Sequence, residues 1–355
     1  MPETKNQGRN PNKHFSENLG ISVVMPVHNG GSYLQLAVDS ILDQTHKKLE
    51  LLIVDDNSND HAIQKLKTDE RVEVFSSPQK GIVAALNFGF SKARYPYFAR
   101  MDADDISVPH RLETQLNFML EHPEIEISGA KVKLFKDQEK IGGGYKHYEQ
   151  WINHQCTAQQ INKNFFIESC IPHPTLLMHR SVFEKLGGYH DPAWPEDYDL
   201  WCRAHLAGYQ FGKPEGGPLL YWRDYSSRTS RVAKRYSKQS FLQCKARYLS
   251  EWMHLHNKTR CLIWGAGPTG LKLHDYLTDS GIHVSGFIDV NPKLQGRAKR
   301  DKPIEIIEPN PKAATLRRLS DFIVVAVSAR GARDEIRNAL INAGLVELEH
   351  FVLAA

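Results

Sequence analysis

Short apolar runs alternate with helical patterns through the first part of the chain. The runs at 21–25 and 51–54 are rich in β-branched and aliphatic residues, as expected for strands buried in a parallel sheet. Between them, the apolar residues of 33–44 recur three and four positions apart, which predicts an amphipathic helix. A strand, a helix and a second strand in this order form a βαβ unit, so the pattern predicts an α/β fold.

The same alternation continues as far as residue 135. The pattern predicts strands at 72–75, 97–101, 125–129 and 132–135, and helices at 81–90 and from Pro109 onward. The polar segment 136–165 predicts no clear element. Polar clusters directly follow two of the strands, at 55–60 and at 102–105. Because ligands bind at the carboxyl ends of the strands in open α/β sheets, these two clusters are the first candidates for a functional site.

The cluster at 102–105 holds three carboxylates, those of Asp102, Asp104 and Asp105. Like charges this close repel one another unless a cation or hydrogen-bond donors neutralise them. Hard cations such as Mg²⁺ and Mn²⁺ prefer carboxylate and phosphate oxygens as ligands. Asp102 and Asp104 are separated only by small Ala103 and form a DxD motif that predicts a metal site, with a solvated acidic turn as the alternative. Asp105 either assists them or caps the helix that follows.

The segment 228–258 predicts a basic amphipathic helix. Its basic residues are Arg228, Arg231, Lys234, Arg235 and Lys238, and its apolar residues follow at helical spacing from Phe241 to Met253. One interpretation is a linking helix with a solvated basic side. The other is contact with an anionic membrane or with a lipid-phosphate acceptor.

The residues 259–355 repeat the strand-loop-helix order as a separate unit. A strand is followed by a glycine loop containing Gly265, Gly267 and Gly270, and a second strand ends at Asp289, near the offset of a ribose-binding acid. This pattern predicts a small Rossmann-like domain with a second nucleotide site for NAD or a nucleotide sugar. The domain lacks a second mononucleotide half, so a structural or regulatory role is the open alternative.

Composition adds few constraints on the function or location of the protein. The 45 basic and 41 acidic residues give a net charge of +4, too weak to indicate nucleic-acid binding. The five cysteines show no metal-binding spacing and suit a reducing compartment. Residues 1–19 resemble a disordered tail without the apolar segment of a signal peptide, and no run is long enough to span a membrane. We therefore expect a cytoplasmic protein, or one peripheral to the inner face of the cell membrane.

The ordered set of motifs resembles family 2 glycosyltransferases of the GT-A fold. The motifs are Val24–Asn29, Val54–Asp60, Gly81–Asn87, Asp102–Asp105 with Pro109, Arg111 and Gln115, His173–Thr175, Arg180, Leu186–Tyr189 and Glu196–Arg203. The resemblance implies a tail at 1–19, a GT-A catalytic domain at 20–227, a linking helix at 228–258 and an accessory domain at 259–355. The accessory domain resembles the N-terminal domain of bacterial sugar O-acyltransferases.

For the sugar donor, the resemblance implies that Asp102 and Asp104 hold a divalent metal and the diphosphate. Asp56 would accept a hydrogen bond from N3–H of uracil or thymine, with a simple strand-end turn as the alternative. The remaining residues assigned to the donor are Pro26, Val27, Asn29, Gly81 and Asn87. Gly81 would allow close approach of the donor, with a plain helix start as the alternative.

For the acceptor, the resemblance implies that Asp197 is the general base that takes the proton of the attacking hydroxyl. Glu196, grouped with it as catalytic, would hydrogen-bond to the backbone or the acceptor, and Asp199 could also face the site. An acidic first turn favoured by the helix dipole is the alternative for all three. His173 and Trp201 are assigned to the acceptor side. A base without an opposing nucleophile implies single displacement with inversion.

One departure from the family concerns the metal. Relatives often carry Arg-x-His after the last sheet strand, whereas this chain has Tyr225 at the place of the histidine. Either the metal has fewer protein ligands here, or His173 or Asp224 takes the vacant role.

The resulting hypothesis is an inverting glycosyltransferase that uses a nucleotide-diphosphate sugar, with UDP or dTDP favoured, and Mn²⁺ or Mg²⁺. Its acceptor would be a glycan or a lipid-linked glycan in bacterial cell-surface polysaccharide biosynthesis. An NAD-dependent sugar-modifying oxidoreductase centred on 259–355, and a non-catalytic protein that binds nucleotide sugars, are the alternatives.

Overall fold

The chain forms two compact units. The computed structural model describes residues 18–137, 141–226, 228–308, 311–319, 321–329 and 331–355, so positions 1–17 of the predicted tail lie outside the described residues. The first unit comprises Met1–Ala158, Ile171–Asp191 and Ala207–Arg228. The second comprises Gln159–Cys170, Pro192–Leu206 and Thr229–Ala355. The segment with Glu196 and Asp197 thus groups with the C-terminal residues.

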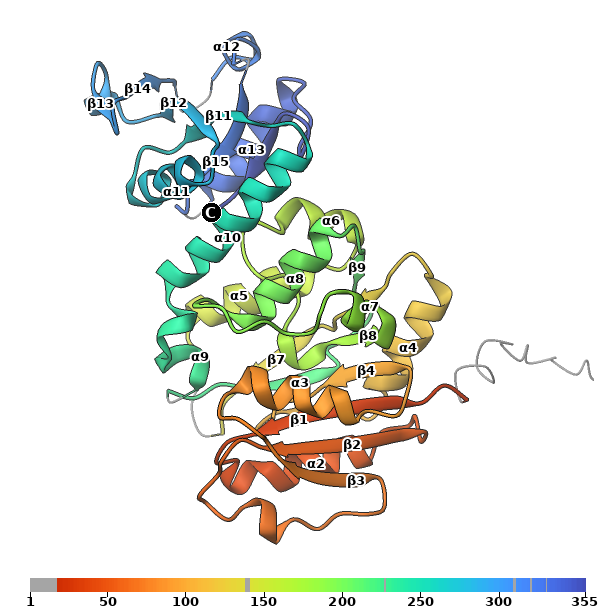
Figure 1. Cartoon of the computed structure of the whole chain (residues 1–355). Helices are drawn as coiled ribbons and strands as arrows, with labels where there is room; N and C mark the ends of the chain where they lie inside the picture. The colour runs from red at the N-terminus through yellow and green to blue at the C-terminus, as the bar shows by residue number, and fades with distance from the viewer. Residues whose placement is uncertain (1–17, 138–140, 227, 309–310, 320, 330) are drawn as a thin grey trace, which may run out of the picture. The chain divides into compact units, whose positions relative to one another are not determined.

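The first unit is built on a mixed sheet of seven strands in the order β3-β2-β1-β4-β8-β6-β9 (Figure 1). These strands are β1 (Ile21–Val27), β2 (Leu49–Asp55), β3 (Val72–Ser76), β4 (Tyr97–Arg100), β6 (Ile127–Ser128), β8 (Leu177–His179) and β9 (Phe211–Gly212). β1 pairs in parallel with β2 and β4, whereas β8 runs antiparallel to β4. A second sheet joins β5 (Ile106–Ser107), β10 (Leu220–Arg223) and β7 (Val132–Phe135).

Helices cover both faces of the large sheet. On one face, Val23 and Met25 of β1 are fully buried in a core with α2 (Leu34–Leu42). On the other face lies α3 (Ile82–Lys92), which contacts β1 and β2. A β-carbon at Gly89 of α3 would lie 2.5 Å from a methyl group of Val24, so only glycine lets this helix approach the strand so closely. The alternation of strands and helices therefore confirms the α/β fold that the pattern predicts.

Several helices differ from the prediction. The helix expected from Pro109 begins at Arg111, as α4 (Arg111–Glu121), after a turn in which Arg111 N–H donates to the carbonyl of Val108. The polar segment without a predicted element contains α5 (Gly143–His154) and α6 (Ala158–Asn164). Ile152 is the one buried residue of α5, which explains why its apolar pattern is weak. A short helix, α7 (Arg180–Lys185), follows β8.

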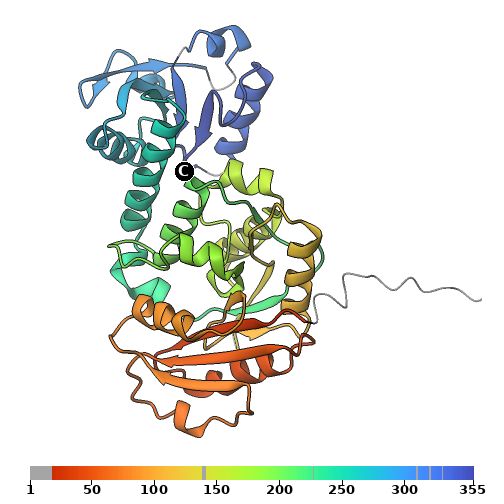
Figure 2. The same cartoon turned by 45° about the vertical axis from the view of Figure 1, so that its right-hand side comes forward.

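The second unit contains a six-stranded sheet in the order β13-β14-β12-β11-β15-β16 (Figure 2). Its strands are β11 (Arg260–Trp264), β12 (His283–Asp289), β13 (Ala298–Lys299), β14 (Lys302–Ile306), β15 (Phe322–Val325) and β16 (Phe351–Leu353). All pairs except β13 with β14 are parallel. Its helices are α11 (Pro268–Asp279), α12 (Ala313–Arg317) and α13 (Ala332–Asn342). This sheet confirms a second α/β domain.

The helix predicted over 228–258 is divided into three pieces. They are α9 (Thr229–Val232), a 3-10 turn at Lys234–Tyr236 and α10 (Lys238–Leu255). The backbone is extended at Ala233 and Ser237, and the Ser237 hydroxyl accepts a hydrogen bond from Ser240 N–H to cap α10. The second unit also holds α8 (Glu196–Leu206).

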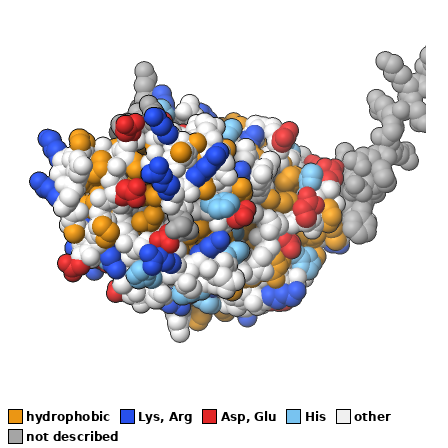
Figure 3. Space-filling model, turned by 90° about the horizontal axis from the view of Figure 1, so that it is seen from above, with side chains coloured by type: hydrophobic (Ala, Val, Ile, Leu, Met, Phe, Trp, Pro, Cys, Tyr) orange, Lys and Arg blue, Asp and Glu red, His pale blue; other side chains and the backbone are white. Residues whose placement is uncertain are grey.

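Two observations bear on membrane contact. Throughout the described residues, every helix falls short of the length and hydrophobicity needed to cross a bilayer. On the face shown in Figure 3, basic, acidic and hydrophobic side chains are interspersed, without a broad basic area. The expected peripheral contact stays a prediction.

Candidate active site

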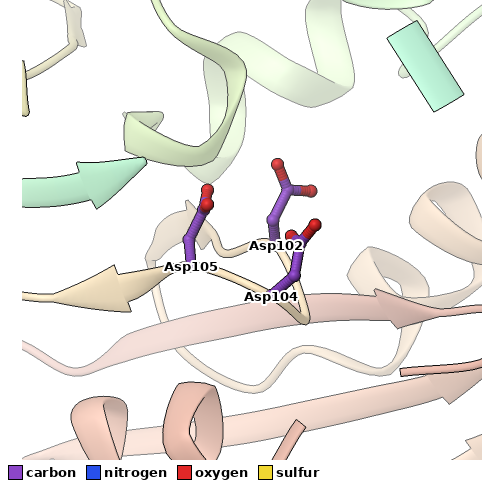
Figure 4. Close-up of side chains that lie close together, drawn as sticks. All are labelled: Asp102, Asp104 and Asp105. Carbon is purple, nitrogen blue, oxygen red and sulfur yellow. The ribbon is translucent and has the colours of Figure 1, made fainter. Parts of the chain in front are cut away.

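The three aspartates of the DxD region lie on the turn directly after β4. One oxygen from each of Asp102, Asp104 and Asp105 can be chosen so that all three lie within 4.8 Å of one another, the only such group of three acidic, histidine or cysteine residues in the described parts of the chain. Figure 4 shows the carboxylates of Asp102 and Asp104 side by side, with Asp105 further along the turn. The structure therefore brings together the residues that the sequence assigns to a metal.

Each carboxylate is held through one oxygen. Asp102 forms an ion pair with Arg100, and Asp104 Oδ2 accepts a hydrogen bond from the Tyr225 hydroxyl at 2.7 Å. Asp105 Oδ1 accepts from Arg223 N–H at 2.8 Å, while its Oδ2 is buried without a partner among the described residues. A buried carboxylate oxygen without a donor is costly, so this turn has unused capacity to bind a cation.

Electrostatics support the same conclusion. Burial, followed by the charge of Asp102, raises the pKa of Asp104 above its usual value. Burial, followed by the charges of Asp102 and Asp104, raises the pKa of Asp105 well above its usual value. In both residues, burial first and the neighbouring carboxylates second disfavour the ionised form, and a bound cation would favour it.

The loops after β1 and β2 are tied to each other. Asn29 N–H donates to the Ser58 hydroxyl at 3.0 Å, and Asn29 Oδ1 accepts from Asn59 N–H at 2.8 Å. Asp56 is buried, and its Oδ1 accepts from Gly81 N–H at 2.7 Å, which links the end of β2 to the start of α3. Pro26 and Val27 are the last two residues of β1. The residues that the resemblance assigns to the sugar donor thus gather at the carboxyl edge of the first unit's sheet.

Asn87 and His173 both contact Tyr189. The Asn87 side chain donates to the carbonyl of Tyr189 at 2.7 Å and accepts from its N–H at 2.9 Å. His173 is buried, with Nε2 at 2.7 Å from the Tyr189 hydroxyl, and burial followed by the charge of Arg100 lowers its pKa. Both residues therefore anchor the turn at Gly187–Tyr189, and their proposed contacts with donor and acceptor stay predictions.

The carboxylates at the start of α8 have different surroundings. Glu196 is buried, and both of its oxygens lie 2.8 Å from the Tyr236 hydroxyl. Asp199 is buried and accepts hydrogen bonds from Trp194 Nε1, Arg203 Nε and the Tyr248 hydroxyl. Asp197 is only partly buried, and its Oδ1 accepts from Tyr198 N–H at 2.7 Å. Of the three, Asp197 is the one that solvent reaches.

Trp201 lies on the same helix, two to five residues beyond these carboxylates. Its side chain is almost fully buried within the second unit. The contact with an acceptor that the resemblance implies for Trp201 stays a prediction.

The glycine loop of the second unit has the geometry of a tight strand-to-helix turn. Gly265 has φ of +114°, and a β-carbon at Gly270 would lie 1.8 Å from the Gly265 carbonyl oxygen. Nothing lies within 4 Å of the corresponding position at Gly267. Asp289 Oδ2 accepts from Ala266 N–H at 2.8 Å, and its Oδ1 accepts from Asn291 N–H at 2.9 Å. Asp289 therefore holds the loop itself, and ligand binding here stays a prediction.

Sequence reasoning missed the residues that support the acidic turn. Arg223 places its guanidinium 4.0 Å from the ring centre of Tyr33 and 4.5 Å from that of Phe135, and its Nε donates to the carbonyl of Asp104. Tyr33 is almost two hundred positions away in the chain, so no local pattern could relate the two. The one feature of the sequence that could have pointed to this support is Tyr225, which stands where the resemblance implies a histidine.

A Rossmann-like mixed sheet that carries an acidic turn directly after β4 is typical of the class of GT-A nucleotide-sugar transferases. The sequence model described as "Glycosyl transferase family 2" matches residues 22–187. The chain is 35% identical over 188 residues to the O-antigen biosynthesis glycosyltransferase WbnJ of Escherichia coli, covering 52% of this chain and 70% of that protein. The chain therefore belongs to glycosyltransferase family 2 and is a glycosyltransferase.

Other relatives agree with this assignment. An uncharacterized glycosyltransferase of Haemophilus influenzae is 28% identical over 221 residues, covering 60% of this chain and 68% of its own length. Among solved structures, the 1–349 fragment of S. aureus TarS in complex with UDP-GlcNAc superposes with a TM-score of 0.53 and 16% identity, covering 68% of this chain and 70% of that one. This likeness shows the fold.

Proposed function

We propose that this glycosyltransferase moves a sugar from a nucleotide-diphosphate donor to a hydroxyl group of a glycan or lipid-linked acceptor by single displacement with inversion. The observation that carries the proposal is the acidic turn after β4, where three carboxylates converge and Asp105 Oδ2 is buried without a donor among the described residues. A diphosphate leaving group needs its charge neutralised, and a divalent cation on these oxygens neutralises it.

The residues fit such a cation. Asp102 and Asp104 would hold Mn²⁺ or Mg²⁺, with Asp105 beside them, because hard divalent cations prefer an oxygen-only donor set. When bound, the ion supplies Lewis-acid stabilisation of the diphosphate. The surrounding protein keeps one oxygen of each carboxylate engaged with Arg100, Tyr225 or Arg223 N–H, which fixes the turn.

For the donor base, we propose UDP or dTDP. Asp56 is buried at the sheet edge and uses Oδ1 for Gly81 N–H, so its other oxygen is available for N3–H of a uracil or thymine. The linked loops with Asn29, and the end of β1 at Pro26 and Val27, would line the base and ribose.

For the base that activates the acceptor, we propose Asp197. A general base must reach the substrate proton, and the contacts of Glu196 and Asp199 engage those two carboxylates inside the second unit. Asp197 is partly exposed on the same first turn. Glu196 then serves as a positioning residue, because its contact with Tyr236 fixes the start of α8.

For the biological setting, we propose cell-surface polysaccharide assembly at the inner face of the cell membrane. Support comes from the 35% identity to an O-antigen biosynthesis enzyme. The oxidoreductase alternative has less support, because both Asp289 oxygens already accept hydrogen bonds from the backbone of its own loop. A nucleotide or NAD at Gly265, Gly267 and Gly270 stays a prediction.

The test is calorimetric titration of the full chain with UDP, dTDP, GDP and NAD(H), with and without Mn²⁺. We expect binding of UDP or dTDP that requires Mn²⁺. Tight NAD(H) binding combined with no metal-dependent nucleotide binding would overturn the proposal and move the chemistry to the second unit. Metal-dependent binding of GDP alone would overturn the donor assignment and leave the transferase class intact.

A further inference from the structure

We propose that Tyr225 is a positioning residue that orients the Asp104 carboxylate for the divalent cation. The inference rests on the proposed metal role of Asp102 and Asp104. It concerns Tyr225, which stands where the resemblance to family 2 glycosyltransferases implies a histidine.

The contact itself is short and specific. The Tyr225 hydroxyl donates to Asp104 Oδ2 at 2.7 Å, which fixes the rotation of that carboxylate. Because this oxygen is engaged, Oδ1 is left as the less restrained ligand atom of Asp104. The Tyr225 ring lies 6.2 Å from the ring of Tyr33, so packing limits its movement. Loss of a hydrogen-bond partner that orients a metal ligand typically weakens metal binding by about 10- to 100-fold.

The end of β10 holds the rest of the same turn. Arg223 N–H donates to Asp105 Oδ1 at 2.8 Å, and Arg223 Nε donates to the carbonyl of Asp104 at 2.7 Å. The Arg223 guanidinium lies between the rings of Tyr33 and Phe135 and forms an ion pair with Asp137. Three donors within residues 223–225 therefore hold the carbonyl of Asp104 and the carboxylates of Asp104 and Asp105.

The other candidates for a third ligand are engaged elsewhere. His173 Nε2 lies 2.7 Å from the Tyr189 hydroxyl within the buried interior. Asp224 is buried with Oδ2 at 3.9 Å from Lys136 Nζ, and its N–H donates to the carbonyl of Phe135. Neither joins the group of carboxylates that the described residues bring within ligand distance. Asp105, held by Arg223 N–H, is therefore the further oxygen donor beside Asp102 and Asp104, and Tyr225 acts on Asp104 through its hydrogen bond.

The first experiment measures Mn²⁺ binding by electron paramagnetic resonance with saturating UDP, in the full chain. Tyr225→Phe removes the hydroxyl and keeps the ring, and we expect about tenfold weaker Mn²⁺ binding. The matched control is Tyr221→Phe on β10, four residues earlier, where the tyrosine is 46% exposed, and it should bind Mn²⁺ like the unchanged protein. Equal Mn²⁺ affinity in Tyr225→Phe and Tyr221→Phe would overturn the inference.

The second experiment uses Tyr225→His, which restores the residue type of the family motif. If position 225 lies at the metal, the imidazole can ligate Mn²⁺, and electron spin echo modulation from ¹⁴N should appear in this variant and be absent from Tyr221→His. Bound Mn²⁺ without that modulation in Tyr225→His would overturn the inference. If the unchanged protein binds no Mn²⁺ at any nucleotide concentration, the proposed metal role of Asp102 and Asp104 fails. This result differs from failure of the Tyr225 inference, in which the unchanged protein binds Mn²⁺ and the Tyr225 variants do not behave as expected.

Discussion

The Tyr248 hydroxyl donates a hydrogen bond of 2.6 Å to Asp199 Oδ1, which joins the middle of α10 to the first turn of α8. Nearby, the ring of Phe241 on α10 stacks on Tyr198 of α8 at 4.4 Å. Further along α10, Lys245 Nζ donates to the carbonyl of Ala354 at 3.0 Å, and Trp252 contacts Phe322 of β15. The helix that carries Asp197 is therefore attached through α10 to the C-terminal sheet of the same unit.

Tyr248→Phe should loosen α8 without unfolding the protein. The change leaves the buried Asp199 with Trp194 and Arg203 but removes one charge-assisted hydrogen bond, so we expect a loss of about 1.5–2 kcal/mol in local stability. Amide hydrogen exchange of α8 measures this loss. Tyr276→Phe on α11 is the control and should change exchange by less than about 0.5 kcal/mol. Unaltered exchange of α8 in Tyr248→Phe would show that α10 does not stabilise it.

Asp197→Asn should retain donor binding and lose transfer. The amide keeps the size and the hydrogen bond to Tyr198 N–H but cannot accept the acceptor's proton, so we expect transfer to fall by about 100-fold or more. Release of nucleoside diphosphate with a panel of glycan acceptors measures the rate, and calorimetry measures donor binding. Asp279→Asn, at the end of α11, is the control. Normal turnover by Asp197→Asn would exclude this residue as the base.

Asp104→Asn should weaken metal-dependent nucleotide binding. The substitution removes one negative charge and one anionic ligand from the acidic turn, and we expect at least about tenfold weaker binding of UDP in the presence of Mn²⁺. Binding measured without metal should change little. Asp43→Asn, an exposed aspartate after α2, serves as the control. Undiminished Mn²⁺-dependent binding by Asp104→Asn would remove the metal role from this residue.

His205 should make the second unit sensitive to acid. Its ring stacks on Phe165 at 4.2 Å, and burial followed by the charge of His256 lowers the pKa of His205 from 6.5 to about 4. The folded state therefore favours the neutral ring. The contribution of His205 to the free energy of unfolding is complete above about pH 6.5 and is lost as the pH falls toward about 4. At about pH 4.5, roughly 2.5 kcal/mol of this contribution is lost.

His205→Phe tests this pH dependence, because phenylalanine keeps the stacking and has no proton to gain. Amide exchange of α8, measured between about pH 6.5 and about pH 4.5, should show a smaller loss of stability in His205→Phe than in the unchanged protein. Parallel losses in the two proteins would assign the acid sensitivity to other groups.

Much of the fold is visible in the sequence because its signals are local. The β1, α2 and β2 segments are predicted correctly to within a few residues, since strand and helix periods depend only on nearby side chains. The helix α5 was missed because it buries one residue, and its stability depends on contacts with distant strands. The division of 228–258 into three pieces depends on the cap at Ser237, which the basic pattern conceals.

The candidate site likewise has residues that the sequence identifies and contacts that only the fold reveals. Asp102, Asp104 and Asp105 were identified from their spacing, because one short turn brings them together whatever surrounds it. The hydrogen bonds of Asn87 and His173 with Tyr189 were not visible, since they join residues 102 and 16 positions apart in the chain. The partly exposed Asp197 and the buried Glu196 and Asp199 look equivalent in the sequence, and only their neighbours on α10 and the turn before it distinguish them.

The sequence by itself determined the α/β class, the family and the acidic turn, because periodicity and close motifs are properties of adjacent residues. Only the tertiary structure decided that α8 groups with the C-terminal domain and that Tyr225 and Arg223 hold the acidic turn. The physical reason is that hydrogen bonds and burial act between atoms a few ångströms apart, and folding brings such atoms together from positions more than a hundred residues apart in the chain.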